Sequence, residues 1–371
     1  MSDFRKIRVG VVFGGRSGEH EVSVRSARSI IQALDKTKYD VVPIGIDKSG
    51  RWLTGDQLLL SDSGAVPSLE SGEVILYPAP QDEPGLVPVA SSGDAGGMVQ
   101  TLDVVFPIVH GTYGEDGALQ GLFELADIPF VGSGVVGSAV GMDKAIFKYV
   151  MAANGIPLLP WELVLSAAVT ADVNGVVTQL EAKLAYPMFV KPANLGSSVG
   201  ISKCEDATEL VAGLIDAARY DLRLVIEQGV HVRELEVSVL GNEDPVASVV
   251  GEIRPKRAFY DYEAKYITDD SELLIPAPID EVLTAEIQQL AIQTYEAVDC
   301  AGLARVDFLL DVETNRVYIN EVNTLPGFTS ISMYPKLWEA AGLSYSDLLD
   351  RLLTLAVDRH RAKAALKRDF N

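Results

Sequence analysis

The sequence has few cysteines, few histidines and no long apolar run. Its 371 residues include 2 cysteines and 4 histidines. Two cysteines cannot build a disulfide framework, and histidines this far apart argue against a zinc site. No run of about eighteen apolar residues occurs, and the N-terminus has neither the apolar core nor the cleavage pattern of a signal peptide. These absences predict a protein of the reducing cytoplasm without a membrane-spanning segment.

Positive charge is also scarce. The chain carries 31 Lys and Arg against 52 Asp and Glu, a formal net charge of -21. This excess of negative charge argues against nucleic acid or an anionic membrane as the main partner. An anionic ligand would bind only where the few cations converge. The apolar share of 48% is that of a globular protein, and the length allows two or three domains with their own cores.

The first part of the chain alternates strand-like and helix-like segments, as expected for an open α/β domain with a parallel sheet. We expect strands at 7–13, 41–46 and 103–109, and helices after Gly14-Gly15 and near 117–126. Residues 48–100 interrupt this alternation because they are rich in Gly, Pro, Ser and Asp, which predicts a surface insert. The expected N-terminal domain is 1–134, including this insert.

Two further domains follow a cluster of small residues at 132–142, GSGVVGSAVGM, which we interpret as a domain junction. A helix is expected from its N-cap Asp143 to about residue 154. The remaining expected elements are strands at 186–191, 223–228, 234–240 and 245–252, an irregular stretch at 254–278, and helices at 206–219, 281–298 and about 346–366. We expect a central domain at 135–226 and a C-terminal domain at 227–371.

The usual nucleotide signatures are absent. Gly132 and Gly137 have Walker A spacing, but Ser138 stands where that motif needs lysine, and no GxGxxG follows the first strand. Residues 190–200, VKPANLGSSVG, offer another way to hold phosphates. Lys191 leaves a strand there, and the Gly and Ser residues after it can direct backbone N–H groups and hydroxyls toward phosphate oxygens.

A second lysine, Lys144, lies in the first turn of its expected helix, where the helix dipole disfavours a cation. An anionic ligand would explain this placement. For both Lys144 and Lys191 the alternative is a solvated surface cation, which is the usual state of a lysine.

Two segments, ARVDFLLD and INEVNTLPGFTS, predict one metal site. Residues two apart in a strand share a face, so Arg305 lies beside Asp307, and Glu321 beside Asn323. A hairpin would bring these groups onto one patch, whose oxygen ligands suit Mg²⁺. A three-residue loop or a bulge pairs Asp307 with Glu321, and we predict an odd-length turn that contains Asn315. The alternative is a solvated hairpin with incidental charges.

A further segment, VIEQGVHVRELEVSVLG, places Glu227 at the end of one expected strand and Glu234 near the start of the next. A carboxylate in an inter-domain crevice can accept hydrogen bonds from an adenine amino group or from ribose hydroxyls. The backbone groups of Gln228 and Val230 could then read the adenine edge. The alternative is that both glutamates are solvated.

Two turns and one loop carry the remaining candidates. GGRSGEHEVS puts Glu19 at the carboxyl end of the first strand, the usual ligand edge of an open α/β sheet. HGTYGEDGALQG puts His110 before a helix, where a ligand contact and a structural hydrogen bond are equally good explanations. Residues 259–278 combine aromatic side chains, Lys265 and several acids, which we interpret as a lid that excludes water. A disordered connection is the alternative.

Taken together, these segments strongly resemble the D-alanine:D-alanine ligases of the ATP-grasp superfamily. The resemblance is carried by GGRSGEHEVS, HGTYGEDGALQG, MDK at 142–144, VKPANLGSSVG, FYDYEAKY, LARVDFLLD and INEVNTLPGFTS, which occur in the family's order. It implies a three-domain ATP-grasp fold of the α/β and α+β classes. The N-terminal domain would be open α/β, with ATP held between the central and C-terminal domains.

The resemblance also implies the nucleotide and metal sites. The ATP-binding residues would be Lys144, Lys191, Gly196, Ser197, Ser198, Glu227, Gln228, Val230, Glu234, Phe259, Lys265, Asn320 and Glu321. Asp307, Glu321 and Asn323 would hold two Mg²⁺ ions, with Glu321 bridging them. Mn²⁺ could replace Mg²⁺, and a monovalent cation could activate the enzyme.

The substrate site is implied in the same way. The catalytic residues would be Glu19, Ser197, Tyr266, Arg305 and Gly327, and the substrate contacts Glu19, His110, Lys265, Tyr266, Arg305, Gly327 and Ser332. Glu19 would hold the ammonium group of the first D-alanine. Lys265 and Ser332 would contact the carboxylate of the second, and Arg305 with the Gly327 amide would stabilise the oxyanion.

The implied reaction is the ATP-dependent ligation of two D-alanine molecules to D-alanyl-D-alanine through a D-alanyl phosphate, with release of ADP and phosphate, for peptidoglycan and cell wall synthesis. Tyr266 favours an amine as the second substrate, since relatives that use D-lactate lack a tyrosine there. The alternatives are a related ligase forming D-alanyl-D-lactate or D-alanyl-D-serine, a nucleotide-binding module without catalysis, and a structural protein. The relatives also imply a homodimer formed through the N-terminal domain.

Overall fold

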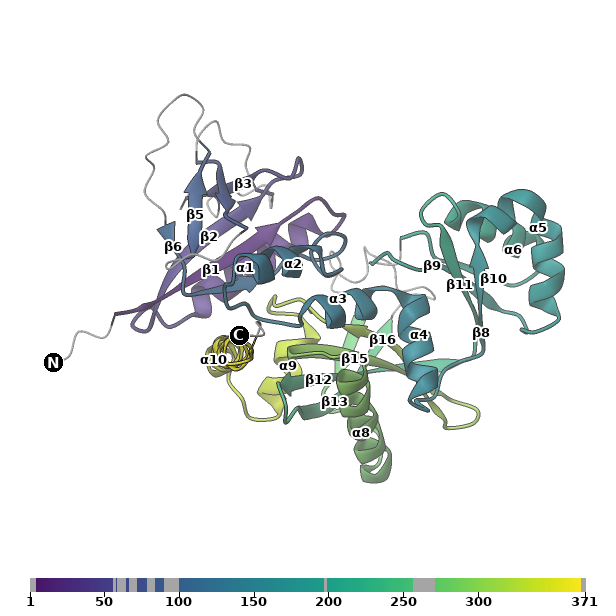
Figure 1. The fold of residues 1–371 in the computed structure, drawn as a ribbon. Coiled ribbons are helices and arrows are strands. Elements are labelled where there is room, and N and C mark those ends of the chain that lie inside the picture. The colour runs from purple at the N-terminus through teal and green to yellow at the C-terminus, as the bar shows by residue number, and fades with distance from the viewer. Residues whose placement is uncertain are drawn as a thin grey trace.

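In the described part of the chain, four β-sheets and the helices that cover them form three lobes (Figure 1). The computed structural model describes residues 5–55, 58, 65–66, 72–78, 84–89, 100–196, 199–255 and 271–367. The N-terminal lobe and the lobe formed by the last part of the chain lie against one another, and the central lobe projects to one side.

The N-terminal sheet is parallel except at one edge. Its strands are β1 (Ile7–Gly14), β2 (Tyr39–Ile46), β3 (Trp52–Thr54) and β7 (Val104–Pro107), in the order β3-β2-β1-β7, with helices α1 (His20–Ala33) and α2 (Ala118–Leu125). β1 pairs in parallel with β2 and β7. The apolar β1 is buried along its last six residues, as a strand between two parallel neighbours requires. The predicted open α/β domain is therefore present.

The insert also contains a sheet. Its described part forms β4 (Val74–Leu76), β5 (Gly85–Pro88) and β6 (Gln100–Thr101), which are antiparallel. Val74, Leu76 and Leu86 are buried and belong to a cluster with Ile44 and Phe123 of the N-terminal lobe. The prediction of a surface insert is therefore incomplete, because short apolar runs in a Gly- and Pro-rich segment extend the core.

The central lobe is an antiparallel sheet covered by two helices on one side (Figure 1). It contains β8 (Trp161–Leu165), β9 (Met188–Pro192), β10 (Ser202–Cys204) and β11 (Arg223–Gln228), in the order β10-β9-β11-β8, with α5 (Ser166–Glu181) and α6 (Ala207–Ala217). Sequence reasoning missed β8 and α5. In α5 the helical period is interrupted at Asp172, whose φ and ψ of -158° and 84° are not helical.

The third lobe is built on a five-stranded antiparallel sheet. Its strands are β12 (Val232–Gly241), β13 (Val246–Pro255), β14 (Ser271–Leu274), β15 (Gly302–Asp311) and β16 (Val317–Asn323), in the order β14-β13-β12-β15-β16, with helices α3 (Val135–Met142), α4 (Lys144–Ala153), α8 (Glu281–Ala297), α9 (Met333–Ala340) and α10 (Tyr345–Ala364). α3 contacts β16, and α4 contacts both α8 and β11 of the central lobe. The prediction of irregular structure at 254–278 is wrong at β14, which extends the sheet by pairing with β13.

One apolar core joins the N-terminal and C-terminal lobes. Helix α10 contacts α1 and β7 on one side and β15 on the other. Phe328 is fully buried between the lobes, and its ring meets that of Phe106 edge-on at a centroid distance of 5.7 Å. Leu352 of α10 belongs to the same cluster. No helix among the residues that the structure describes is both long and apolar enough to cross a membrane.

The β15–β16 hairpin has the pairing that the metal site requires, but not the predicted turn. Asp307 lies opposite Glu321. The Asp311 N–H donates to the Arg316 oxygen at 3.0 Å, so the pairing continues to these two residues and the turn between them, 312–315, has an even length of four. Its length follows from Asp311, whose carboxylate accepts hydrogen bonds within the turn. A bulge between Asp307 and Phe308 corrects the register, and Asn315 has the expected positive φ of 54°.

Truncation of the shared core tests its contribution to stability. Leu352→Ala removes a side chain that is 0% exposed and is expected to lower the free energy of unfolding by about 2–5 kcal/mol. Urea denaturation measures the change. Leu366→Ala, at a side chain that is 67% exposed, is the matched control and should have little effect. Equal effects of the two substitutions would contradict a core that joins the lobes.

Candidate active site

A cavity of about 200 Å³ lies where the three lobes meet. Most of the predicted site residues that the structure describes line it: Glu19, Lys144, Gly196, Glu234, Arg305, Asp307, Asn320, Glu321, Asn323, Gly327 and Ser332. They come from the turn after β1, the start of α4, the loop after β9, strands β12, β15 and β16, and the segment between β16 and α9. Segments from all three lobes therefore converge on one site.

Acidic side chains from three neighbouring strands form a row along the cavity. Glu236 of β12 lies opposite Asp307, which in turn lies opposite Glu321. Arg305 neutralises part of this row: its Nε and Nη2 donate to the two oxygens of Asp307 at 2.7 and 2.6 Å, and its Nε is 3.0 Å from Glu236 Oε2. Sequence reasoning missed Glu236, although it follows the predicted Glu234 at the two-residue spacing of one strand face.

The residues present fit a hard divalent cation. No group of three or more His, Cys, Asp or Glu side chains suited to a metal occurs in the described ranges. Two carboxylates and the Asn323 amide, with water and phosphate oxygens, nevertheless form the kind of oxygen set that Mg²⁺ uses. Both oxygens of Asp307 accept hydrogen bonds from Arg305, and Asn323 Oδ1 accepts one from the Leu325 N–H at 3.0 Å. Because a carboxylate oxygen has two lone pairs, Asp307 can coordinate a cation while each of its oxygens accepts one of these hydrogen bonds from Arg305.

Lys144 is held at the cavity by its helix and by the loop after β9. As predicted, Asp143 is the N-cap of α4, with its carboxylate accepting from the Ile146 N–H at 3.0 Å. The Lys144 ammonium donates to the Leu195 backbone oxygen at 2.5 Å. This contact connects the start of α4 with the loop in which glycine and serine residues were predicted to hold phosphates.

A buried triad lies beyond Lys144. Glu227 is paired with two lysines: Lys148 contacts Oε1 and Lys191 contacts Oε2. Lys191 was predicted as a site residue, but Lys148 was not. The signal for Lys148 was its position one turn after Lys144 in the otherwise apolar helix KAIFKYVMAA.

The charges of this triad shift its pKa values. Burial alone would raise the pKa of Glu227, but the ammonium groups of Lys148 and Lys191 lower the pKa to about 2. Burial lowers the pKa of Lys148. Although burial also opposes the charge on Lys191, the Glu227 carboxylate raises the pKa of Lys191. Glu227 is therefore ionised at neutral pH and holds the end of β11 against α4.

The end of β11 shows how the proposed adenine-reading segment is positioned. The backbone N–H of Gln228 donates to the Pro160 oxygen at 2.9 Å. The side-chain Oε1 of Gln228 accepts from the Ala185 N–H at 2.9 Å. Gly229 lies against Phe189, since an added Cβ would come within 2.7 Å of that ring. The Gln228 backbone N–H and side chain thus make contacts within the protein.

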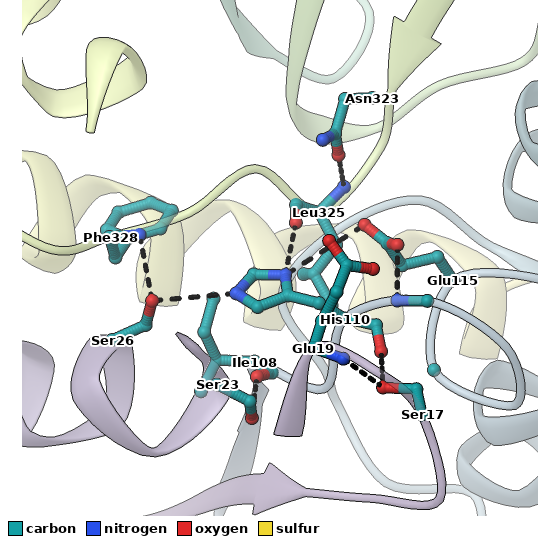
Figure 2. Close-up of polar contacts among 12 residues, drawn as sticks. Ser17, Glu19, Ser23, Ser26, Ile108, His110, Glu115, Asn323, Leu325 and Phe328 are labelled. Carbon is teal, nitrogen blue, oxygen red and sulfur yellow. Dashed lines mark hydrogen bonds and ion pairs between the residues drawn. The ribbon is translucent and has the colours of Figure 1, made fainter. Parts of the chain in front are cut away.

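The N-terminal end of the cavity is organised around His110. Figure 2 shows its ring between the two lobes: Nδ1 is 3.0 Å from the Leu325 oxygen and Nε2 is 3.5 Å from Ser26 Oγ. Ser26 Oγ in turn accepts from the Phe328 N–H at 3.2 Å. His110 thus makes structural hydrogen bonds, one of the two roles that the sequence allowed for it. These bonds attach the segment around Gly327 to the N-terminal lobe. Burial lowers the pKa of His110, which favours the neutral ring.

Two carboxylates lie beside His110. Glu19 Oε2 lies close to two glycines. A Cβ added at Gly111 would lie 2.8 Å from this oxygen, and a Cβ added at Gly196 would lie 3.3 Å from it. Glu115, which was not predicted, accepts from the Gly111 N–H at 2.6 Å and lies 4.0 Å from His110 Nδ1 (Figure 2). Burial and the nearby Glu19 raise the pKa of Glu115. Its position five residues after His110 in HGTYGEDG was the available signal.

Gly327 and Ser332 lie together at the start of α9. A Cβ at Gly327 would lie 2.9 Å from Ser332 Oγ, and the Thr329 N–H donates to that hydroxyl at 3.0 Å. Five predicted residues, Ser197, Ser198, Phe259, Lys265 and Tyr266, fall outside the described residues, as does most of the predicted lid, whereas Val230 is described and half-buried just after β11.

Comparisons with known proteins agree with this architecture. Residues 8–133 match the family model described as D-ala D-ala ligase N-terminus, and residues 150–354 match the model described as D-ala D-ala ligase C-terminus. The chain belongs to the D-alanine–D-alanine ligase family. A D-alanine–D-alanine ligase from Heliobacterium modesticaldum is 51% identical over 364 residues, which cover 96% of each chain.

Solved structures of this ligase family have the same fold. The D-alanine-D-alanine ligase from Coxiella burnetii matches with a TM-score of 0.84 at 39% identity and covers 97% of each chain. The VanG D-Ala:D-Ser ligase from Enterococcus faecalis matches with a TM-score of 0.82 at 33% identity, covering 95% of this chain and 100% of its own. The predicted ATP-grasp fold of mixed α/β and α+β class, with its N-terminal open α/β domain, is therefore confirmed.

The triad predicts a specific dependence of stability on pH. Because the folded pKa of Glu227, about 2, lies below its ordinary value of 4.5, the ionised carboxylate stabilises the fold above pH 4.5. This stabilisation is lost as the pH falls from 4.5 toward 2 and amounts to about 3 kcal/mol. The stability advantage of the wild type over Glu227→Gln should therefore shrink in acid, which urea denaturation at several pH values measures.

Glu162→Gln is the matched control for this measurement. Glu162 pairs with Lys183 at 2.8 Å on the surface of the same lobe, and such exposed pairs contribute little to stability. The difference in the free energy of unfolding between the wild type and Glu227→Gln should shrink as the pH falls. A difference that stayed constant or grew would contradict the assigned charge states.

Proposed function

We propose that the chain joins two D-alanine molecules into D-alanyl-D-alanine, with cleavage of ATP to ADP and phosphate. The observation that carries the proposal is the convergence of Asp307, Glu321, Arg305 and Lys144 with Glu19 in one cavity. Membership of the D-alanine–D-alanine ligase family supports the same reaction. The product would serve as a peptidoglycan precursor for the cell wall.

The nucleotide would lie between the central and C-terminal lobes. Lys144 and Lys191, with Gly196 and the Ser197–Ser198 segment, would bind the triphosphate. Glu234 would hold the ribose, and the adenine would meet Glu227, Gln228, Val230 and Phe259, while Asn320 and Lys265 complete the ATP contacts. Since the Gln228 N–H already donates to Pro160, its backbone oxygen is the group we assign to the adenine.

Asp307, Glu321 and Asn323 would hold the divalent cations. When bound, such ions withdraw charge from the phosphate oxygens as the phosphoryl group is transferred. We propose two Mg²⁺ ions, with Mn²⁺ as a possible substitute, and activation by a monovalent cation. The ligands' position on one sheet face supports this assignment.

The first step would use Glu19 and the γ-phosphate. Glu19 holds the ammonium group of the first D-alanine, with His110 supporting this end of the cavity and Ser197 linking Glu19 to Tyr266. The substrate carboxylate attacks the γ-phosphorus, the bond to the bridging oxygen breaks, and ADP leaves. The carboxylate is thereby converted to an acylphosphate with a good leaving group.

The second step would use Arg305 and the Gly327 amide. Lys265 and Ser332 hold the carboxylate of the second D-alanine, so that its amine, after losing a proton, attacks the acylphosphate carbon. The resulting oxyanion lies near Arg305 and the Gly327 N–H, and collapse of the adduct expels phosphate. Arg305 already lies at the cavity, held between Glu236 and Asp307.

We further propose the wider setting of the enzyme. The domains would be 1–134, 135–226 and 227–371, with ATP between the last two, and α3 and α4 of the second segment pack on the C-terminal lobe. The protein would act in the cytoplasm on D-alanine and ATP, as a homodimer formed through the N-terminal domain, without nucleic acid or membrane as a partner.

Substrate dependence tests the proposed reaction. With ATP and Mg²⁺, phosphate release is expected with D-alanine but not with L-alanine, and the product should be D-alanyl-D-alanine. With equal D-lactate added, the D-alanine product should still dominate, because Tyr266 favours an amine as the second substrate. The same is expected with equal D-serine, since the chain is 51% identical to a D-alanine–D-alanine ligase and 33% identical to a D-Ala:D-Ser ligase. Release with L-alanine alone, or a dominant mixed product, would refute the assignment.

Arg305→Ala tests the second step. Loss of one oxyanion donor, worth about 3 kcal/mol, is expected to cut turnover by roughly a hundredfold or more while ATP-analogue binding stays nearly intact. Arg316→Ala, at an exposed position beside the turn of the same hairpin, is the control and should keep normal turnover. Near-normal turnover of Arg305→Ala would remove the role assigned to this side chain.

A further inference from the structure

Lys148 is a buried cation that the proposed reaction does not use. It lies on α4, where its residue exposure is 2%, and its ammonium group contacts Glu227 Oε1. Its Nζ also lies 6.0 Å from the centre of the Trp161 ring on β8. A buried lysine costs free energy unless it is paired, so the ion pair with Glu227 is what stabilises the charged Lys148 at this position.

The other partner of Glu227 is in a different situation. Lys191 contacts Oε2, but its side chain is 16% exposed, against 2% for Lys148. Lys191 stands at the end of β9, next to the loop expected to hold phosphates. Of the two lysines, Lys191 is the one with room to turn toward a ligand, whereas Lys148 is enclosed by α4, β8 and β11.

Departure of Lys191 would be costly without a second cation. Glu227 is 3% exposed, and a buried carboxylate that loses its partner destabilises a protein strongly. With Lys148 in place, Glu227 keeps one ion pair when Lys191 leaves, and the buried charges sum to zero. The very low pKa of Glu227 is consistent with this surplus of positive charge around it.

We propose that Lys148 is a positioning residue that keeps Glu227 paired and thereby releases Lys191 to bind the triphosphate of ATP. The proposal rests on the proposed function, because it requires that Lys191 contacts nucleotide phosphates. In the protein without nucleotide both lysines hold Glu227. In the complex Lys148 alone holds it, and Glu227 remains an anionic acceptor at the adenine end of the site.

The proposal predicts an effect confined to phosphorylated ligands. In Lys148→Met, Lys191 is the only cation left for Glu227, so a triphosphate must compete with a buried carboxylate for it. Binding of the non-hydrolysable analogue adenosine 5′-(β,γ-imido)triphosphate with Mg²⁺ should weaken by about tenfold to a hundredfold. Binding of adenosine, which needs no Lys191, should change little.

A second substitution should then restore the preference for the phosphorylated ligand. In the double variant Lys148→Met with Glu227→Gln, the amide cannot retain Lys191 by charge, so Lys191 is again available to the triphosphate. Because Glu227 also meets the adenine, isothermal titration should compare the ratio of analogue affinity to adenosine affinity. This ratio should be several-fold higher in the double variant than in Lys148→Met, by the loss of one charged hydrogen bond. A merely structural role for Lys148 gives no such rescue, since the second substitution would only add damage.

Two further variants complete the design. Lys148→Arg keeps the charge and should retain most of the analogue affinity. Lys183→Met removes a surface lysine of the same lobe, paired with Glu162, and should bind both ligands like the wild type. If Lys148→Met does not fold, the double variant alone tests the proposal. Its ratio of analogue affinity to adenosine affinity should be at least as high as the ratio of the wild type.

Several outcomes would overturn the proposal. The first is an analogue affinity of Lys148→Met equal to that of the wild type. The second is an equal loss of affinity for the analogue and for adenosine in that variant. The third is a double variant whose ratio of analogue to adenosine affinity is no higher than that of Lys148→Met. Wild-type protein that bound neither ligand would contradict the ATP site itself and the proposal with it. Because no D-alanine is present, a failure of the ligation reaction alone would leave these affinities unchanged and is thus distinguishable.

Discussion

The pairing of Asp307 with Glu321 across β15 and β16 is the constraint on which the rest of the site depends. A shift of one residue would turn Glu321 toward the opposite face of the sheet, where Phe308 and Ile319 are buried in the apolar core. The bulge beside Asp307 prevents this, and it leaves apolar side chains on one face and charged ones on the other. β12 continues the same row with Glu236, so the position of Arg305 also follows from strand register.

A second constraint keeps the two ends of the cavity in a fixed relation. The N-terminal and C-terminal lobes share one core around Phe328 and α10, and His110 with Ser26 attaches the segment after β16 to the N-terminal lobe. The central lobe has its own core and reaches the cavity through the loop between β9 and β10. The shared core therefore fixes the proposed substrate side of the cavity, whereas the proposed nucleotide side includes a lobe with a core of its own.

Local sequence signals were sufficient for the elements that carry most of the site. Asp143 at the start of α4, the apolar alternation of β15 and the left-handed conformation of Asn315 each follow from chemistry within a few residues. Lys148, Glu115 and Glu236 carried only weak local signals, and the partners of Lys148 and Glu236 are distant in the chain or on neighbouring strands. Lys148 meets Glu227 only 79 residues later, and the turn length at Asp311 depends on which side-chain hydrogen bonds form. The interrupted helix α5 shows the same limit, since tertiary packing holds it where its periodicity is weak.

The most direct test of the central claim is a crystal structure with Mg²⁺ and a non-hydrolysable ATP analogue. The account predicts that Asp307, Glu321 and Asn323 contribute oxygens at about 2.1 Å from the cations, with the phosphates beside Lys144 and Lys191. Nucleotide bound away from this cavity, or cations held without the β15 and β16 carboxylates, would contradict it.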